Sequence, residues 1–296
     1  MSRTLGADPV CVFGEVLFDR FSDGREVFGG APFNVAWNLQ ALGVTPFFIS
    51  RVGEDRLGHR ILESMSGWGM TTDGVQIDSD HPTGTVEVTL SGEEPTFEIA
   101  SDRAYDWIED RSSQSGDSVL YHGSLVARSD TSRTTLMSVV RRHQGTVFFD
   151  VNLRSPWWET EVVLRLLQTT HHLKVNENEL RCLEPEARGL RELACSLLSR
   201  SRATRLYVTR GAQGAIVFAP DRNSCEVRPP GATPLVDAVG AGDAFSAVLI
   251  IGHIEDWPLE TTLARAQEFA GAVVGLRGAT TADRKFYERF AANWRD

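Results

Sequence analysis

The sequence reads DAVGAGDAF from Asp237 to Phe245, and this stretch organises the prediction of the fold. Its Gly-Ala-Gly turn leads directly into an apolar run that is compatible with a helix. Small residues let backbone N–H groups approach a ligand, and a helix N-terminus adds partial positive charge, so this turn suits a phosphate. Asp243 would repel that anion unless it takes a proton from a hydroxyl that attacks the phosphorus. Alternatively, the stretch is a plain tight turn and Asp243 caps the helix.

Composition and net charge narrow the class of protein. Of the 296 residues, 42% are hydrophobic and 24% are charged, which is typical of a globular protein. The formal net charge of −10 argues against a nucleic-acid partner, because phosphate backbones require clustered Lys and Arg. No apolar run reaches membrane-spanning length, the N-terminal residues lack a signal-peptide pattern, and the four cysteines lack metal-ligand spacing. We expect a cytoplasmic protein without a membrane partner.

Short apolar runs alternate with helix-compatible stretches along most of the chain. This rhythm is typical of a parallel sheet with helices on both faces. The expected strands lie near 10–14, 46–52, 118–122, 146–151, 171–175 and 205–209, with an antiparallel edge pair at 214–219 and 224–228. The expected helices lie near 35–42, 56–69, 129–143, 157–169, 187–202, 242–254, 259–276 and 282–294. The sequence predicts a doubly wound α/β fold in which residues 1–296 form a single domain.

Two insertions interrupt this rhythm in the N-terminal half. Residues 21–28 contain a Ser-Asp-Gly turn that indicates a hairpin. Residues 83–100 alternate apolar and polar side chains on both sides of a turn at 92–94, which is typical of a hairpin with one polar face. We expect the insertions near 15–29 and 83–105 to form a small β-sheet lid.

A second glycine-rich stretch, Gly29-Gly30-Ala31-Pro32-Phe33-Asn34, precedes another helix. Alone it indicates either an Asn amide suited to sugar hydroxyls or a simple helix start with an early proline. Together, GGAPFNVA and DAVGAGDAF resemble the two motifs of the PfkB (ribokinase-like) carbohydrate kinases. Further segments resemble blocks of that family in the family's order, at 14–19, 51–58, 150–154, 176–179 and 208–214. The GE…D opening, GGAPFN and DVNLR are most similar to the fructokinase branch.

The resemblance implies roles for individual residues. Asp243 would be the catalytic base, and the anion hole for the transferring phosphate would be formed by Gly240, Ala241 and Gly242. The sugar would be held by Asp19, Gly30, Asn34, Arg103 and Arg154. The nucleotide site would include Asn176, Glu179, Thr209, Gly211 and Gly214, with Glu179 also helping to hold Mg²⁺ through water. A parallel sheet would bring such strand ends and helix starts to one edge.

The resemblance also implies ATP and Mg²⁺, with K⁺ as a further ligand near this loop and Gly278-Ala279. Ala238 departs from the family, which usually has Thr there, so the requirement for K⁺ is left open. Lids of family members often pair, and we therefore expect a homodimer through residues 84–100.

The expected reaction is phosphorylation of a sugar primary hydroxyl by ATP, with fructose as the expected substrate. A carboxylate at Asp19 would repel an acidic sugar, which favours a neutral one. Arg103 and Tyr105 nevertheless keep 2-keto-3-deoxygluconate open as an alternative. Ribose and a nucleoside are further alternatives, and a non-catalytic sugar-binding sensor on the same fold is the alternative from another class.

Overall fold

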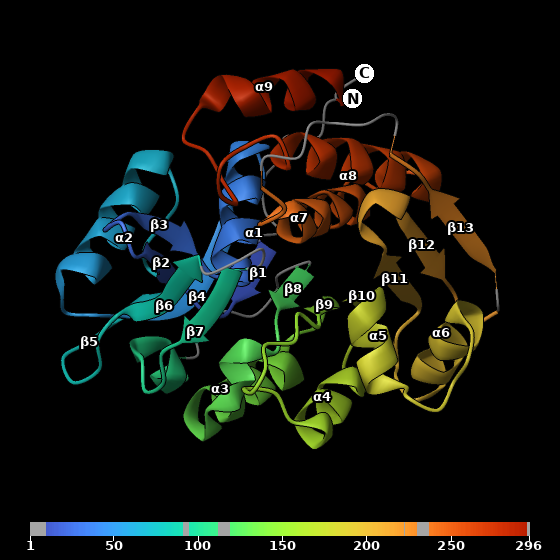
Figure 1. Cartoon of the computed structure of the whole chain (residues 1–296), viewed down its shortest axis with the longest axis horizontal. Helices are drawn as coiled ribbons and strands as arrows, with labels where there is room; N and C mark the ends of the chain where they lie inside the picture. The colour runs from blue at the N-terminus through green and yellow to red at the C-terminus, as the bar shows by residue number, and fades with distance from the viewer. Residues whose placement is uncertain (1–9, 91–94, 112–118, 222, 230–236, 295–296) are drawn as a thin grey trace.

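The computed structural model describes residues 10–90, 95–111, 119–221, 223–229 and 237–294 (Figure 1). Within these residues, nine strands form a main sheet in the order β13-β12-β11-β10-β9-β8-β1-β4-β5. Their bounds are β1 Val10–Phe13, β4 Pro46–Gly53, β5 Val75–Asp78, β8 Val119–His122, β9 Thr146–Asp150, β10 His172–Asn176, β11 Arg205–Thr209, β12 Ala215–Phe218 and β13 Ser224–Val227.

The main sheet is parallel from β5 to β11, and β12 and β13 add antiparallel strands at one edge. The chain runs outward from β1 to β4 and β5, and then returns to build β8 to β11 on the other side of β1. The strand order therefore reverses between β1 and β8, where open α/β sheets bind ligands at the carboxyl ends of their strands. The predicted doubly wound fold is confirmed.

Helices cover both faces of this sheet (Figure 1). Side chains of β1 alternate between two cores, with Val10 and Val12 in one and Cys11 and Phe13 in the other. The first core includes α1 (Ala31–Ala41), α2 (Arg56–Trp68), α7 (Ala241–Ile254), α8 (Leu259–Val273) and α9 (Arg284–Asn293). The second includes α3 (Asp130–Arg142), α4 (Thr160–Leu167), α5 (Glu177–Leu183) and α6 (Leu190–Ser199). Residues 244–252 of α7 are all buried, which explains its uninterrupted apolar run.

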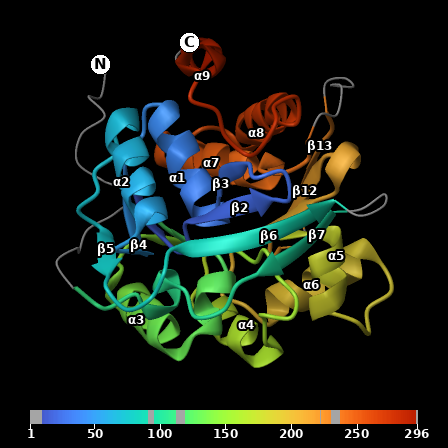
Figure 2. The same cartoon turned by 60° about the vertical axis from the view of Figure 1, so that its left-hand side comes forward.

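A second sheet forms the predicted lid from β2 (Leu17–Phe21), β3 (Glu26–Gly29), β6 (Gly84–Leu90) and β7 (Pro95–Ile99), in the order β3-β2-β6-β7. Figure 2 shows β2 and β6 running across the body of the molecule. One face of the lid packs Leu17, Val86 and Ile99 against Tyr105 and Leu125. The turn expected at 92–94 lies outside the described residues.

The sequence prediction missed two short elements and misplaced the start of a third. Strand β5 has four residues and α5 has seven, so neither contains enough positions for a clear period. Helix α4 begins at Thr160 rather than near residue 157. The amide of Trp157 donates to the carbonyl of Arg154 at 2.7 Å, which holds these residues in a turn before the helix.

Candidate active site

Asp243 lies in the first turn of α7, directly after the Gly-Ala-Gly turn. Gly240 has a φ of 82°, and a Cβ there would collide with Ala279, so this turn requires glycine. The carboxylate of Asp243 accepts a hydrogen bond of 2.8 Å from Nδ2 of Asn34, in the first turn of α1. This bond joins the two glycine-rich motifs, which lie 209 residues apart in the sequence. The predicted base and a predicted sugar ligand are therefore in direct contact.

The environment of Asp243 makes it a stronger base than an exposed aspartate. Burial raises the pKa of Asp243 to about 6 from an ordinary value of 3.8. The hydrogen bond from Asn34 and the charges of Lys174 and Arg154 lower this pKa, whereas the charge of Asp150 raises it. Asp243 is thus ionised at neutral pH and able to accept a proton from a hydroxyl.

Asp19 lies on the lid and shares charged neighbours with this site. It stands opposite Val86 of β6, on the lid face that packs against Tyr105 and Leu125. Burial raises the pKa of Asp19 to about 6, the charge of Arg154 lowers it, and the charge of Asp237 raises it. Because Arg154 also acts on Asp243, it is a common neighbour of the two carboxylates.

Gly30 begins α1 with a φ of 98°. A Cβ at this position would lie 2.6 Å from the carbonyl oxygen of Glu15, so glycine is required where α1 meets the loop after β1. Oδ1 of Asn34 and Oε2 of Glu15 are buried and lack a hydrogen-bond partner among the described residues. Buried acceptors of this kind are available to the hydroxyl groups of a ligand.

Three buried residues near this space were not among the predicted site residues: Glu15, Tyr105 and Arg128. Each influences the pKa of another through its charge, and burial raises the pKa of Glu15 to about 7. Arg128 is fixed by two hydrogen bonds of 2.7 Å to Asp106, yet its Nη1 has no partner in the described part of the chain. The hydroxyl of Tyr105 is likewise buried without a partner there. Glu15 follows a buried strand and could have been inferred, and the sequence offered Tyr105 only as a partner of an acidic sugar, whereas Arg128 carried no sequence signal.

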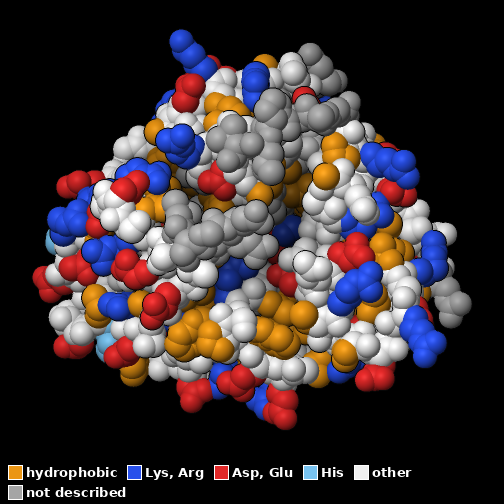
Figure 3. Space-filling view, viewed as in Figure 1, with side chains coloured by type: hydrophobic (Ala, Val, Ile, Leu, Met, Phe, Trp, Pro, Cys, Tyr) orange, Lys and Arg blue, Asp and Glu red, His pale blue; other side chains and the backbone are white. Residues whose placement is uncertain are grey.

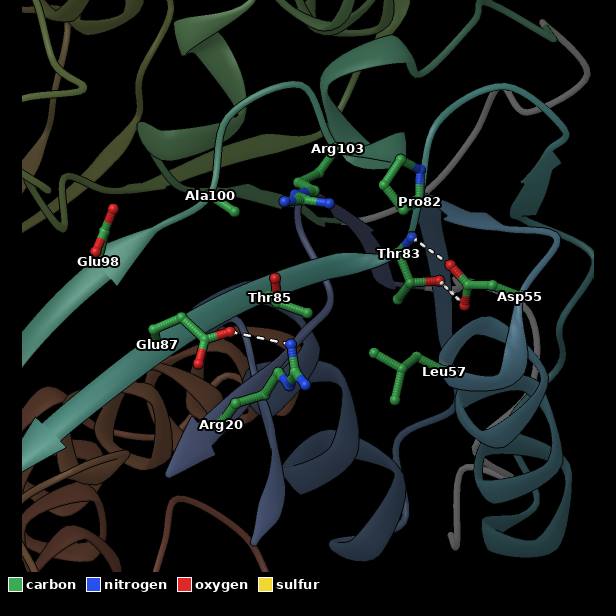
Figure 4. A pocket seen from close by; sticks show the side chains of 10 residues that line it. All are labelled: Arg20, Asp55, Leu57, Pro82, Thr83, Thr85, Glu87, Glu98, Ala100 and Arg103. Carbon is green, nitrogen blue, oxygen red and sulfur yellow. Dashed lines mark hydrogen bonds and ion pairs between the residues drawn. The ribbon is translucent and has the colours of Figure 1, made fainter. Parts of the chain in front are cut away.

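Another predicted sugar ligand, Arg103, lies beside the lid. It lines a cavity of ≈ 400 Å³ together with Arg20, Glu87 and Glu98 (Figure 4). Arg20 and Glu87 alternate along their strands with Asp19 and Val86, so this cavity opens on the opposite face of the lid. The structure does not bring Arg103 together with the other predicted sugar ligands.

The predicted nucleotide residues gather at the carboxyl ends of β10 and β11. Asn176 and Glu179 form a capping box at the start of α5, in which each side chain accepts from the other residue's backbone amide at 2.8 Å. The second carboxylate oxygen of Glu179 accepts from the amide of Leu153 at 2.9 Å. Thr209 stands beside Asn176 in the sheet.

The loop that follows Thr209 depends on two glycines with positive φ. Gly211 has a φ of 54° and Gly214 a φ of 87°, and a Cβ on Gly214 would collide with the carbonyl oxygen of Val227. These glycines let the loop turn tightly beside the predicted nucleotide site.

The face of the molecule in Figure 3 is hollowed near its middle, and basic and acidic side chains lie in the hollow.

Residues 9–285 match the protein family described as pfkB family carbohydrate kinase. The chain belongs to this family. It is therefore a carbohydrate kinase, in agreement with the resemblance of its motifs and with the contact that joins Asn34 to Asp243.

Relatives of this kinase match it along nearly the full chain. An uncharacterized sugar kinase from Pyrococcus horikoshii is 32% identical over 93% of this chain and 93% of its own length. Its crystal structure in complex with ATP covers 91% of this chain and 93% of that chain, at 27% identity and a TM-score of 0.78. A fructokinase from Escherichia coli is 31% identical over 92% of this chain and 95% of its own length.

A fructokinase from Vibrio cholerae was solved in a form with fructose, ADP and calcium ion bound. It covers 95% of this chain and 98% of that chain, at 25% identity and a TM-score of 0.80. The kinase thus has the ribokinase-like fold with a separate lid sheet. In the part of the chain that the structure describes, no helix combines the length and apolar character needed to cross a bilayer.

Proposed function

We propose that this kinase transfers the γ-phosphoryl group of ATP to a primary hydroxyl of fructose. The observation that carries the proposal is the hydrogen bond of 2.8 Å between Asn34 and Asp243. It places an amide suited to sugar hydroxyls against a half-buried carboxylate at a helix N-terminus. ATP as the phosphoryl donor fits a cytoplasmic enzyme.

The reaction uses Asp243 as the general base. The sugar hydroxyl donates its proton to Asp243 while its oxygen attacks the γ-phosphorus. The new oxygen–phosphorus bond forms as the bond from the γ-phosphorus to the bridging oxygen breaks, and ADP leaves with that electron pair. The backbone amides of residues 240–242 stabilise the charge on the transferred group. A phosphotransferase needs a base such as Asp243 beside its anion hole, whereas a sugar-binding sensor has no use for one.

The residues around this space favour a neutral sugar. Asp19 and Asp243 are carboxylates that accept hydrogen bonds from hydroxyl groups, and the unpartnered Oδ1 of Asn34 adds a third acceptor. Of the two residues that kept an acidic sugar open as a substrate, Arg103 lines the cavity on the opposite face of the lid, whereas Tyr105 is buried near this space. The names of the Escherichia coli and Vibrio cholerae relatives point in the same direction.

Mg²⁺ would be held through water near Asn176 and Glu179. Each carboxylate oxygen of Glu179 accepts one backbone amide, which fixes the carboxylate and leaves lone pairs for water ligands. Bound Mg²⁺ would neutralise phosphate charge during transfer. This donor set fits a hard cation that keeps several of its waters.

K⁺ would bind between the loop at 237–240 and the segment at 278–279. The carboxylate of Asp237 accepts from the amides of Val239 at 3.0 Å and Gly278 at 3.1 Å, so it fastens these two segments together. Their carbonyl groups fit a monovalent cation, although Ala238 contributes no hydroxyl.

We also propose that residues 1–296 form one domain and that the chain dimerises through lid residues 84–100, of which 91–94 lie outside the described residues.

An assay of ADP release with a panel of acceptors tests the substrate assignment. We expect kcat/KM for fructose to exceed the values for ribose, a nucleoside and 2-keto-3-deoxygluconate by at least about tenfold, a margin that a few hydrogen bonds supply. A higher kcat/KM for 2-keto-3-deoxygluconate would overturn the assignment to fructose. If none of the acceptors causes ADP release, the result would instead support a non-catalytic sugar-binding sensor. A molar mass measured in solution tests the dimer separately, and a monomer with full activity contradicts it.

A further inference from the structure

Lys174 is an unusual residue in this sequence. The chain has two lysines among its 30 basic residues, so arginine serves at the other basic positions. Lys285 is exposed on α9, whereas Lys174 is only 5% exposed in the middle of the main sheet. A buried ammonium is costly unless it is paired, and it differs from a guanidinium in being a compact point charge. The protein thus places one of its two lysines where a compact cation matters.

A buried carboxylate holds this ammonium in one place. Nζ of Lys174 lies 2.7 Å from Oδ2 of Asp150, its neighbour on β9. The same oxygen accepts from the hydroxyl of Ser246 on α7 at 2.8 Å and from the hydroxyl of Tyr121 on β8 at 3.2 Å. Donors from three elements therefore fix the Asp150 carboxylate, which leaves Nζ little freedom to move.

The ammonium stands directly beside the anion hole. Nζ lies 3.4 Å from the point that a Cβ on Gly242 would occupy. The charge of Lys174 reaches Asp243, whose pKa it lowers. An ammonium carries three N–H groups, and within the described residues Nζ has Asp150 as its hydrogen-bond partner and no second one. Two N–H groups are thus available for a ligand at the Gly240–Gly242 turn.

We propose that Lys174 is a catalytic residue whose Nζ binds a non-bridging oxygen of the transferred phosphoryl group, and that Asp150 is the positioning residue that holds Nζ beside Gly242. The proposal rests on ATP as the phosphoryl donor. Besides burial, the charge of Asp150 raises the pKa of both Glu179 and Asp243, so three carboxylates lie in this region and an approaching phosphate needs a local cation. A fixed ammonium supplies that charge without reorganisation during transfer.

A purely structural ion pair is the competing explanation, and a double variant separates the two. Lys174→Met alone leaves a buried unpaired carboxylate and can unfold the protein. Lys174→Met combined with Asp150→Asn removes both charges and keeps the donors from Ser246 and Tyr121 satisfied. Lys285→Met is the matched control, because it removes the exposed lysine.

Calorimetric titration with ADP and with a non-hydrolysable ATP analogue measures the contact without any sugar. For the double variant we expect the dissociation constant of the analogue to rise roughly tenfold more than that of ADP, since only the analogue carries the γ-phosphate. With any accepted sugar, kcat should fall by about 10²–10³-fold, while the KM for the sugar changes little. Asp150→Asn alone should lower kcat in the same way without changing the KM for the sugar.

The proposal is overturned if the folded double variant retains kcat within about threefold of the wild type, or if both nucleotides lose affinity equally. Because the nucleotide titration needs no acceptor, it decides the role of Lys174 even if fructose is not the substrate. Lys285→Met should match the wild type in both measurements.

Discussion

Replacing Asp243 by asparagine should stabilise the ligand-free enzyme at alkaline pH. The substitution keeps the shape of the side chain and leaves an oxygen that can accept from Nδ2 of Asn34. Burial raises the pKa of Asp243 to about 6 from 3.8, so the folded protein holds this proton more tightly than the unfolded chain does. Each pKa unit corresponds to about 1.4 kcal/mol, which makes ionised Asp243 a cost of about 3 kcal/mol once the pH is well above 6.

The sign of this effect gives it a pH dependence. The cost is absent below the pKa of the unfolded chain, grows as the pH rises, and is complete above the folded pKa of about 6. The free energy of unfolding of Asp243→Asn should therefore exceed that of the wild type by about 3 kcal/mol near pH 8 and by about half as much near pH 5. Urea unfolding of both proteins without ligands measures the difference.

Asp73→Asn is the control for this experiment, since Asp73 is exposed on a loop. It should give no comparable dependence on pH. A stability difference between Asp243→Asn and the wild type that is the same near pH 5 and pH 8 would refute the reasoning, because it would show that the carboxylate ionises without cost in the folded protein.

Three further predictions concern activity and the anion-hole turn. Because Asp243 must be ionised to accept a proton, kcat/KM should fall about tenfold per pH unit below about pH 6, and a flat profile down to about pH 5 would contradict this. Asp19→Ala should cost roughly 2–4 kcal/mol in kcat/KM, since a charged hydrogen bond to the sugar is lost, and unchanged fructose kinetics would contradict this role. Gly240→Ala should destabilise the protein by several kcal/mol in urea unfolding, because its Cβ would collide with Ala279, whereas Gly24→Ala, with a similar φ and open space around it, should cost only about 1 kcal/mol. Equal costs at the two glycines would show that the collision does not matter.

The sequence predicted the fold well where elements are long and buried. Apolar strand runs and the apolar helix after Gly240 have one common explanation, which is burial between two layers. The alternation at 83–100 likewise predicted the lid hairpin. Strand β5 and helix α5 were not predicted, because a period is poorly defined over so few residues. The Asn176–Glu179 capping box was nevertheless a usable signal for α5.

The site was predicted in part, and the gaps have physical causes. The contact between Asn34 and Asp243 depends on how α1 packs beside α7, which no local pattern encodes. The sequence could not give the position of Arg103, because the direction of its side chain relative to the lid depends on the loop that carries it. Lys174 did carry a signal, namely a charged residue inside a buried strand, which requires a partner such as Asp150.

The central claim is that Asp243 is the base that accepts the proton of the sugar hydroxyl. Turnover and fructose binding of Asp243→Asn, measured on the same preparation in the presence of ATP and Mg²⁺, test it most directly. The account predicts that kcat falls by about 10²–10⁴-fold while the dissociation constant of fructose changes by no more than a few-fold. Turnover close to that of the wild type would contradict the account.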